Sequence, residues 1–294
     1  MFPGLVLVLS SLRARMQEGR RCNIYLFQQG FSSQQISELQ AICADPSCCL
    51  IVRGISVEQF QQFPSFNGNY LNYGRLLLPE LLVHENKVVY LDCDLLVNLD
   101  IATLFDQMMD RLPLAGVPYG RMDSMDDWEL MQKHGLPPEA DYINNGVLLL
   151  DLEMWRRENL MAASMEFMQT NRTDLLRHEQ SLMNCLFFGR IKMLPERFNQ
   201  VAIPDVPLPE LPSEGIIHFV GTPKPWEPGA RTLNKQHPIF VEGCQQLGLK
   251  LPVGSYKQIL KDPRSYARLS LRILGLHSIW KRLEQAISLV RRSS

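Results

Sequence analysis

The stretch KVVYLDCD, Lys87–Asp94, decides the fold, because an apolar run ends there at two carboxylates separated by one residue. Apolar side chains on both sides of the run predict a strand in the middle of a sheet. In open α/β sheets, ligands bind beyond the carboxyl ends of the strands. Asp92 and Asp94 therefore indicate a site for one divalent cation, Mn²⁺ or Mg²⁺, which prefers oxygen ligands. The alternative is that both residues only shape the turn after the strand.

Short apolar runs alternate with helical patterns on either side of this stretch. The alternation predicts an α/β fold with a mostly parallel sheet and helices on both of its faces. The expected strands are Asn23–Phe27, Leu50–Arg53, Lys87–Leu91, Pro113–Pro118, Gly146–Leu152, Ile191–Leu194 and Ile216–Phe219. The expected helices include one capped by Ser32 and Gln35, followed by Arg75–Val83, Leu152–Thr170 and His178–Phe187. A long polar stretch, Tyr119–Tyr142, is expected to cover the substrate.

The composition excludes several classes of protein. Of the 294 residues, 46% are hydrophobic and 21% are charged, which excludes disorder as the main state. The 30 basic residues balance 31 acidic ones, so a protein that coats nucleic acid is not expected. The seven cysteines form no CxxC pair, which removes a zinc ribbon or a thioredoxin motif, and their scatter is typical of a reduced, cytoplasmic protein. No apolar run is long enough for a membrane-spanning helix.

A second motif is IIHFVGTPKPW, Ile216–Trp226. His218 follows a short strand and offers a ring nitrogen to a cation. Gly221 permits a close approach of the backbone. Lys224 stands between two prolines, which disfavour a helix, and offers a point charge to phosphate. The alternative for a lone histidine after a strand is that it is packed or hydrogen-bonded within the fold.

Two further motifs carry polar side chains that suit a sugar. Asn144 and Asn145 stand at the entry to a strong strand, where their amides can bond sugar hydroxyls. The alternative there is an Asn-Gly turn. Glu179 and Gln180 open an apolar helix within HEQSLMN, residues 178–184. Glu179 also suits the dipole at a helix start, and Gln180 is simply solvated in the alternative interpretation.

Taken in this order and spacing, the motifs resemble those of the retaining glycosyltransferases of family 8. This family includes bacterial lipopolysaccharide galactosyl- and glucosyltransferases and, more distantly, glycogenin. The matching strings are YGRLLLPELL, KVVYLDCDLLVNLD, YINNGVLLLDLEMW, HEQSLMN and IIHFVGTPKPW. The resemblance runs from about Pro3 to Cys244, and it implies a GT-A fold, a UDP-sugar donor and Mn²⁺ as the usual cation.

The resemblance also implies which residues hold the metal and the diphosphate. Asp92, Asp94 and His218 would be the protein ligands of the cation. Gly221 and Lys224 would contact the diphosphate. The cation and the lysine would then stabilise the anionic leaving group as the sugar–phosphate bond breaks.

A separate set of residues would hold the sugar. Arg75 lies where the family has an arginine near the donor sugar, and Asn144 and Glu179 would bond its hydroxyls. Gln180 would lie beside the anomeric carbon. Because Gln180 is neutral and a poor nucleophile, we expect attack from the face of the leaving group, with a phosphate oxygen taking the proton of the acceptor.

Three features depart from the pattern of the family. The family begins with a strand whose acidic end contacts uridine, and here Met1 falls where the following helix starts. A misassigned start, a fragment or a lost part of the nucleotide site are the expected explanations. Glu179 replaces the usual Asp, and Tyr119-Gly120-Arg121 stands where relatives often have another Asp. The donor sugar therefore stays open between galactose and glucose.

Charge is unevenly distributed along the chain. Residues 256–294 hold nine basic and two acidic side chains, and this formal +7 leaves −8 on residues 1–255. Ile279, Leu283, Ile287 and Val290 share one helical face. We expect a catalytic domain at 1–255 and a basic amphipathic helical tail at 256–294 that binds the anionic inner surface of a membrane. The alternative is a solvated helix folded onto the acidic body.

The leading prediction is a metal-dependent hexosyltransferase that uses a UDP-sugar donor and a glycan or lipid-linked acceptor. One alternative is a degenerate relative that binds a nucleotide-sugar or a partner without turnover. Another is a metal-dependent phosphohydrolase, which would also use Asp92 and Asp94 but would leave HFVGTPKPW unexplained.

Overall fold

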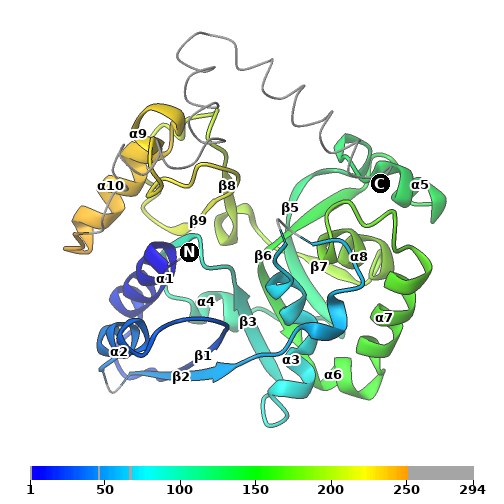
Figure 1. Cartoon of the computed structure of the whole chain (residues 1–294), viewed down its shortest axis with the longest axis horizontal. Helices are drawn as coiled ribbons and strands as arrows, with labels where there is room; N and C mark the ends of the chain where they lie inside the picture. Colours follow the sequence, from blue (N-terminus) through cyan, green and yellow to red (C-terminus); the bar gives the residue numbers. More distant parts are fainter. Residues whose placement is uncertain (1, 46, 66–67, 251–294) are drawn as a thin grey trace. The chain divides into compact units, whose positions relative to one another are not determined.

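The computed structural model describes residues 2–45, 47–65 and 68–250, which form two compact units (Figure 1). The larger unit comprises Leu5–Gln200 and Ser213–His218. The smaller unit comprises residues 2–4, 201–212 and 219–250. The predicted tail at 256–294 and the predicted domain boundary at 255 lie outside the described residues, so both stay predictions.

A four-stranded sheet in the order β3-β6-β5-β7 forms the centre of the larger unit. Its strands are β3 (Lys87–Leu91), β6 (Asp141–Asp151), β5 (Leu114–Arg121) and β7 (Ile191–Met193). β6 is antiparallel to both β3 and β5, and β7 is parallel to β5. The predicted α/β class is confirmed. The prediction of a mostly parallel sheet was wrong, because the sheet is mixed.

The physical reason lies in the connection between β5 and β6. Both strands extend into the polar stretch Tyr119–Tyr142, which was expected to cover the substrate, and Arg121 pairs with Asp141. The chain thus returns beside its own strand, as antiparallel strands can, whereas parallel strands need a crossover. The middle of the connection is built into the core through Met122, Leu130 and Met131, which are buried. It is therefore part of the fold.

The strand β3 is not central, contrary to the prediction, because in the described part of the chain its strand partner is β6 alone. Its apolar character has another cause. Val88 and Tyr90 pack against the hydrophobic core on one face of the sheet, and Val89 and Leu91 pack against the core on the other. Both faces are covered although, in the described residues, no strand pairs with the other edge of β3.

Helices cover both faces of the sheet, as predicted. Along β6, Leu148 and Leu150 belong to one core, and Val147 and Leu149 belong to the other. The first core is completed by α3 (Leu78–Leu81), α6 (Leu152–Arg157), α7 (Leu160–Thr170) and α8 (Glu179–Leu186) (Figure 1). The second is completed by α1 (Phe2–Arg15), α4 (Ala102–Phe105), β4 (Leu95–Asn98) and β9 (Gly215–Phe219).

The local sequence signals were largely correct. Ser32 caps α2 (Ser33–Ile42) and forms the predicted capping box with Gln35. The predicted helix 152–170 is broken by Asn159, which has a φ of 51°. The predicted helix 75–83 is instead the end of a 3-10 helix, Leu71–Leu77, followed by the short α3. The remaining elements of this unit are β1 (Cys22–Gln28), β2 (Cys48–Gly54), α5 (Trp128–Lys133) and the 3-10 helices Glu58–Phe60, Met122–Ser124 and Glu196–Phe198.

The smaller unit has an aromatic core of its own. Phe219, Trp226 and Phe240 contact one another, with ring centroids 5.7–6.3 Å apart. Its helices are α9 (Ala230–Leu233) and α10 (His237–Gln246), and the strand β8 (Gln200–Ala202) enters it from the larger unit. Within the described residues, no helix combines the length and the apolar character needed to cross a membrane.

Candidate functional site

Two carboxylates and an imidazole meet at the end of β3. Asp92 follows β3, Asp94 precedes β4, and His218 lies on β9 directly opposite Leu95 in the antiparallel pairing of β4 with β9. The Nε2 atom of His218 is 3.2 Å from Oδ1 of Asp94 and 3.9 Å from Oδ2 of Asp92. One ligand atom from each residue lies within 4.8 Å of the others, which is close enough for a single cation.

Gly146 makes room for the His218 ring. A Cβ atom at this position would lie 2.1 Å from Cε1 and 2.5 Å from Nδ1 of His218. Asn144, Asn145 and Gly146 all lie inside β6, so the alternative of an Asn-Gly turn is excluded. The backbone N–H of Asp92 donates to the carbonyl of Gly146 at 2.8 Å, which joins the metal-ligand candidates to this strand.

A β-bulge explains how two consecutive asparagines reach the site. Successive side chains of a regular strand point to opposite faces. Between Gly116 and Val117 of β5, the partner on β6 shifts from Leu148 to Asn144, so β6 carries extra residues there. Bulges of this kind re-aim side chains and are frequent beside active sites. The side chains of Asn144 and Asn145 both contact the start of α8 as a result.

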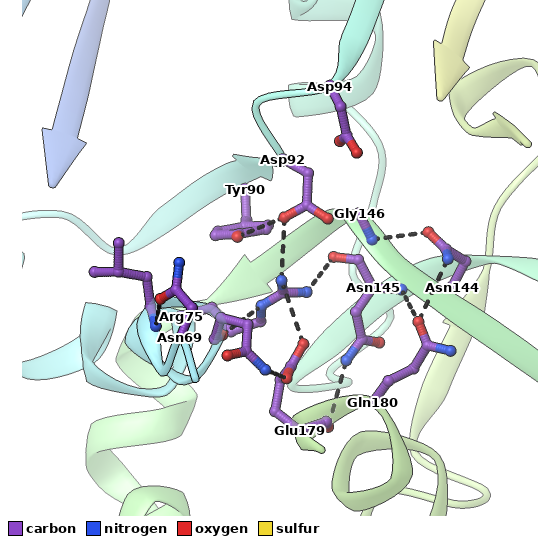
Figure 2. A network of polar contacts seen from close by, with 12 residues as sticks. Asn69, Arg75, Tyr90, Asp92, Asp94, Asn144, Asn145, Gly146, Glu179 and Gln180 are labelled. Carbon is purple, nitrogen blue, oxygen red and sulfur yellow. Dashed lines mark hydrogen bonds and ion pairs between the residues drawn. The ribbon is translucent and has the colours of Figure 1, made fainter. Parts of the chain in front are cut away.

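Arg75 is the buried cation of the site and bridges two carboxylates (Figure 2). Its Nη2 atom lies 3.1 Å from Asp92 and 3.3 Å from Glu179, and its Nη1 donates to the carbonyl of Asn145. Its guanidinium also stacks on Tyr90, 4.3 Å from the ring centroid. Burial by itself lowers the pKa of Arg75, but the neighbouring acidic groups outweigh it, so the pKa is raised and the charge is retained.

Glu179 has a second partner that sequence reasoning missed. The side-chain amide of Asn72 donates to Oε2 of Glu179, while Oε1 faces Arg75. Within the described residues, Oδ1 of Asn72 and Oδ1 of Asn145 are buried and have no hydrogen-bond partner. Such acceptors are costly unless a donor reaches them, and sugar hydroxyls are donors of this kind. Asn72 stands three residues before Arg75, but no pattern in the sequence marks it.

The side-chain oxygen of Gln180 is held by two residues of β6 (Figure 2). Its Oε1 atom accepts from the backbone N–H of Asn145 at 3.1 Å and from the amide of Asn144 at 3.4 Å. Its Nε2 atom lies 3.5 Å from the hydroxyl of Tyr142, which in turn donates to Asp127 at 2.9 Å. Burial raises the pKa of Asp127, and it also raises the pKa of Tyr142. Asp127 lies in the connection between β5 and β6 and was not predicted as part of the site.

The polar network continues through Asn199, another residue without a sequence signal. Its Nδ2 donates to Oδ1 of Asn144 at 3.0 Å, and its Oδ1 lies 3.1 Å from Nδ1 of His218. The larger unit thus brings eight of the ten predicted site residues into one network: Arg75, Asp92, Asp94, Asn144, Asn145, Glu179, Gln180 and His218.

Gly221 and Lys224 belong to the smaller unit. Gly221 has a φ of 74°, a conformation that favours glycine. The Nζ atom of Lys224 donates to the carbonyl of Phe219, and its backbone N–H donates to Glu227. Lys224 lies outside any helix, as its flanking prolines predicted.

Comparison with known proteins places this chain in a family. The model of "Glycosyl transferase family 8" matches residues 2–229. The chain belongs to this family. "Probable glycosyl transferase Gly" of Streptococcus gordonii is 21% identical over 90% of this chain and 37% of that protein. "General stress protein A" of Bacillus subtilis is 26% identical over 56% of this chain and 60% of that protein.

Solved structures show the same fold. The galactosyltransferase LgtC in complex with donor and acceptor sugar analogs superposes with a TM-score of 0.65, with 22% identity over 83% of this chain and 92% of that one. The bifunctional glycosyltransferase WbbM also has a TM-score of 0.65, with 19% identity over 82% of this chain and 47% of that one. The family 8 chain therefore has the predicted GT-A fold. It spans between about a third and three fifths of the length of the first curated relatives it matches.

Proposed function

We propose that this family 8 chain transfers a hexose, galactose or glucose, from a UDP-sugar to a glycan or lipid-linked acceptor with retention of configuration. The observation that carries the proposal is one continuous network. It links the candidate metal ligands Asp92, Asp94 and His218 to polar groups suited to a sugar. A donor with a diphosphate next to a hexose needs both halves of such a site.

The residues present fit a divalent cation. Two carboxylates suit Mn²⁺ or Mg²⁺, a single imidazole is compatible with Mn²⁺, and three protein ligands leave coordination positions for diphosphate oxygens. A bound cation would supply charge stabilisation for the departing diphosphate. Gly221 and Lys224 are proposed to contact the same diphosphate, since one exposes its backbone and the other carries a positive charge.

The sugar would be held by groups that accept hydroxyl hydrogens. Glu179 is fixed by Arg75 and Asn72, so its carboxylate cannot swing away when the donor leaves. The buried oxygens of Asn72 and Asn145 are further acceptors for hydroxyl groups. Because these groups are fixed by the fold before the donor arrives, little ordering is required on binding.

The contacts of Gln180 support attack from the face of the leaving group. Its oxygen already accepts two hydrogen bonds, from Asn145 and Asn144, and carries no charge. The oxygens of Glu179 are engaged by Arg75 and Asn72. Neither side chain is arranged as a nucleophile, so we propose that a phosphate oxygen of the leaving UDP takes the acceptor's proton. A trapped covalent glycosyl-enzyme would contradict this mechanism.

Two measurements, made one after the other, test the proposed function. Calorimetry with UDP, with and without Mn²⁺, should show nucleotide binding that requires the cation. A screen of UDP-sugars should then show release of UDP with at least one hexose donor, and excess chelator should abolish that release. Binding without release of UDP would favour the degenerate binding protein, and release of free phosphate would favour the phosphohydrolase.

The first prediction concerns donor choice by Glu179. In Glu179→Asp the carboxylate retreats by about 1 Å, which breaks its contact with Asn72 and reshapes the sugar site. We expect the ratio of kcat/KM for UDP-glucose and UDP-galactose to change about tenfold, the size of a lost contact in a specificity site, while UDP affinity changes little.

Glu153→Asp is the matched control, because Glu153 is an exposed acidic residue in the first turn of α6. It should leave the ratio unchanged. An equal loss for every donor in Glu179→Asp, with UDP affinity falling in step, would mean that Glu179 is structural.

The second prediction concerns the basic tail, and it rests on sequence alone. Each of the nine basic residues in 256–294 adds about 1 kcal/mol of attraction near an anionic lipid surface. The full chain should sediment with phosphatidylserine vesicles at 0.01 M salt, where the screening length is about 30 Å, and be released at 1 M, where it is about 3 Å. Neutral phosphatidylcholine vesicles are the control. Failure to sediment with anionic vesicles at low salt would favour a soluble acceptor.

A further inference from the structure

We infer that Asn199 is a positioning residue that couples the metal ligand His218 to the sugar-binding residue Asn144. The inference rests on the proposed function for the roles of those two residues. Asn199 follows the 3-10 helix Glu196–Phe198 and is 2% exposed, so its amide is locked inside the fold. Its two ends contact the two halves of the site, one end each.

The orientation of both amides follows from one backbone group. A backbone N–H can only donate, and the N–H of Gly146 lies 2.9 Å from the Asn144 side chain. The atom it meets must therefore be Oδ1 of Asn144. Asn199 approaches that same oxygen at 3.0 Å, so the end of Asn199 that lies there must be its NH₂ group.

The tautomer of His218 follows in turn. With the NH₂ group of Asn199 on Asn144, its carbonyl oxygen faces Nδ1 of His218 at 3.1 Å. An amide oxygen only accepts, so Nδ1 must carry a hydrogen. The lone pair of the neutral ring is then on Nε2, the atom that faces Asp94 and a bound cation.

Two of these hydrogen bonds also fix the sugar side of the site. Because Oδ1 of Asn144 is held by Gly146 and Asn199, its NH₂ group is directed toward Gln180, 3.4 Å away. A flip of the Asn144 amide would place donors against the donors of Gly146 and Asn199. Asn199 thus holds the metal ligand in its binding tautomer and, through its other end, holds Asn144 and the oxygen of Gln180.

The tautomer can be measured in the wild-type protein, so this test does not depend on the folding of a variant. Long-range ¹H–¹⁵N NMR of the ¹⁵N-histidine-labelled full chain, with Mg²⁺ bound, distinguishes a protonated from an unprotonated ring nitrogen. The His218 signal is assigned as the histidine whose resonances broaden when Mn²⁺ replaces Mg²⁺. We expect hydrogen on Nδ1. A spectrum in which Nδ1 carries no hydrogen overturns the inference.

Two variants separate the ends of Asn199. Asn199→Leu removes both contacts, and we expect Mn²⁺ affinity, measured on the protein by EPR without nucleotide, to fall about 10- to 100-fold. Asn199→Asp keeps an acceptor for Nδ1 of His218 but places an oxygen against Oδ1 of Asn144. Its Mn²⁺ affinity should recover to within about threefold of wild type, because carboxylates commonly support metal-binding histidines. The KM of the aspartate variant for the UDP-sugar donor should be higher than that of the wild type, because the contact with Asn144 is still lost.

If Asn199 had a purely structural role, the two variants would rank differently in Mn²⁺ affinity. A buried carboxylate would then be at least as harmful as leucine, and Mn²⁺ affinity would follow the thermal stability of the metal-free variants. Equal Mn²⁺ affinity in the leucine variant and the wild type, or no recovery in the aspartate variant, overturns the inference. Failure of the proposed function would look different. The Mn²⁺ affinities of the wild type and the two variants would then follow the expected order, but the wild type would release no UDP.

Discussion

Asp94→Asn is expected to abolish metal-dependent transfer while the protein stays folded. The substitution keeps the shape of the side chain and removes the charge that offsets dehydration of the cation. Loss of about 4 kcal/mol of charge stabilisation at the leaving diphosphate corresponds to a fall in kcat of about 10³-fold. UDP release from the best donor, measured over a range of Mn²⁺ concentrations, gives this value.

A stability measurement shows the same loss without relying on turnover. At Mn²⁺ concentrations about 100 times the dissociation constant, the wild type should gain about 2.7 kcal/mol in free energy of unfolding, and Asp94→Asn should gain almost nothing. Asp106→Asn is the matched control, because Asp106 is an exposed partner of Arg20. Such surface pairs contribute about 0–1 kcal/mol. Wild-type turnover in the Asp94 variant, or in excess chelator, would contradict the metal site.

Gly146→Ala is expected to weaken both folding and metal binding, because the added methyl group meets the ring of a metal-ligand candidate. The added Cβ would lie 2.1 Å from Cε1 of His218, far inside van der Waals contact. His218 is 3% exposed and its backbone is fixed in β9, so relieving the clash requires the packed surroundings to shift. We expect a loss of about 1–3 kcal/mol in free energy of unfolding from overpacking and a loss of Mn²⁺ affinity of at least tenfold.

Gly54→Ala provides the control for a glycine in a strand. Among the residues that the structure describes, no heavy atom other than those of its chain neighbours lies within 4 Å of a Cβ built at Gly54 in β2, so stability and Mn²⁺ affinity should both stay close to wild type. Chemical denaturation with and without Mn²⁺ measures both quantities for the two variants. If Gly146→Ala keeps full Mn²⁺ affinity, then Mn²⁺ binding does not require the position of the His218 ring that Gly146 makes possible.

The metal-ligand candidates could be found from sequence because each stands beside a strong strand signal. Asp92 and Asp94 end the run Lys87–Leu91, and His218 lies in the apolar run Ile216–Phe219. Strand signals are local, since they depend on side chains a few residues apart. What sequence could not supply was the pairing of β4 with β9, which sets His218 opposite Leu95, 123 positions earlier in the chain.

The supporting residues were invisible for a related reason. Asn72, Asp127 and Asn199 act through side-chain hydrogen bonds to partners elsewhere in the chain, and an isolated polar residue in a loop or a 3-10 helix has no pattern. The purpose of Gly146 was hidden too, because an Asn-Gly pair is a common turn signal. Only the fold shows that Gly146 lies within a strand against an imidazole ring.

The sequence by itself determined the α/β class, most strand positions, the helix cap at Ser32 and the set of chemical groups in the site. These follow from periodicity and residue type, which act over a few neighbouring positions. The tertiary structure alone decided that the sheet is mixed, that β3 lies at its end, and that a bulge directs both Asn144 and Asn145 to one site. It also decided which amide holds His218. Strand direction, register and hydrogen-bond partners depend on how distant segments pack, and that information is not contained in any short stretch of the chain.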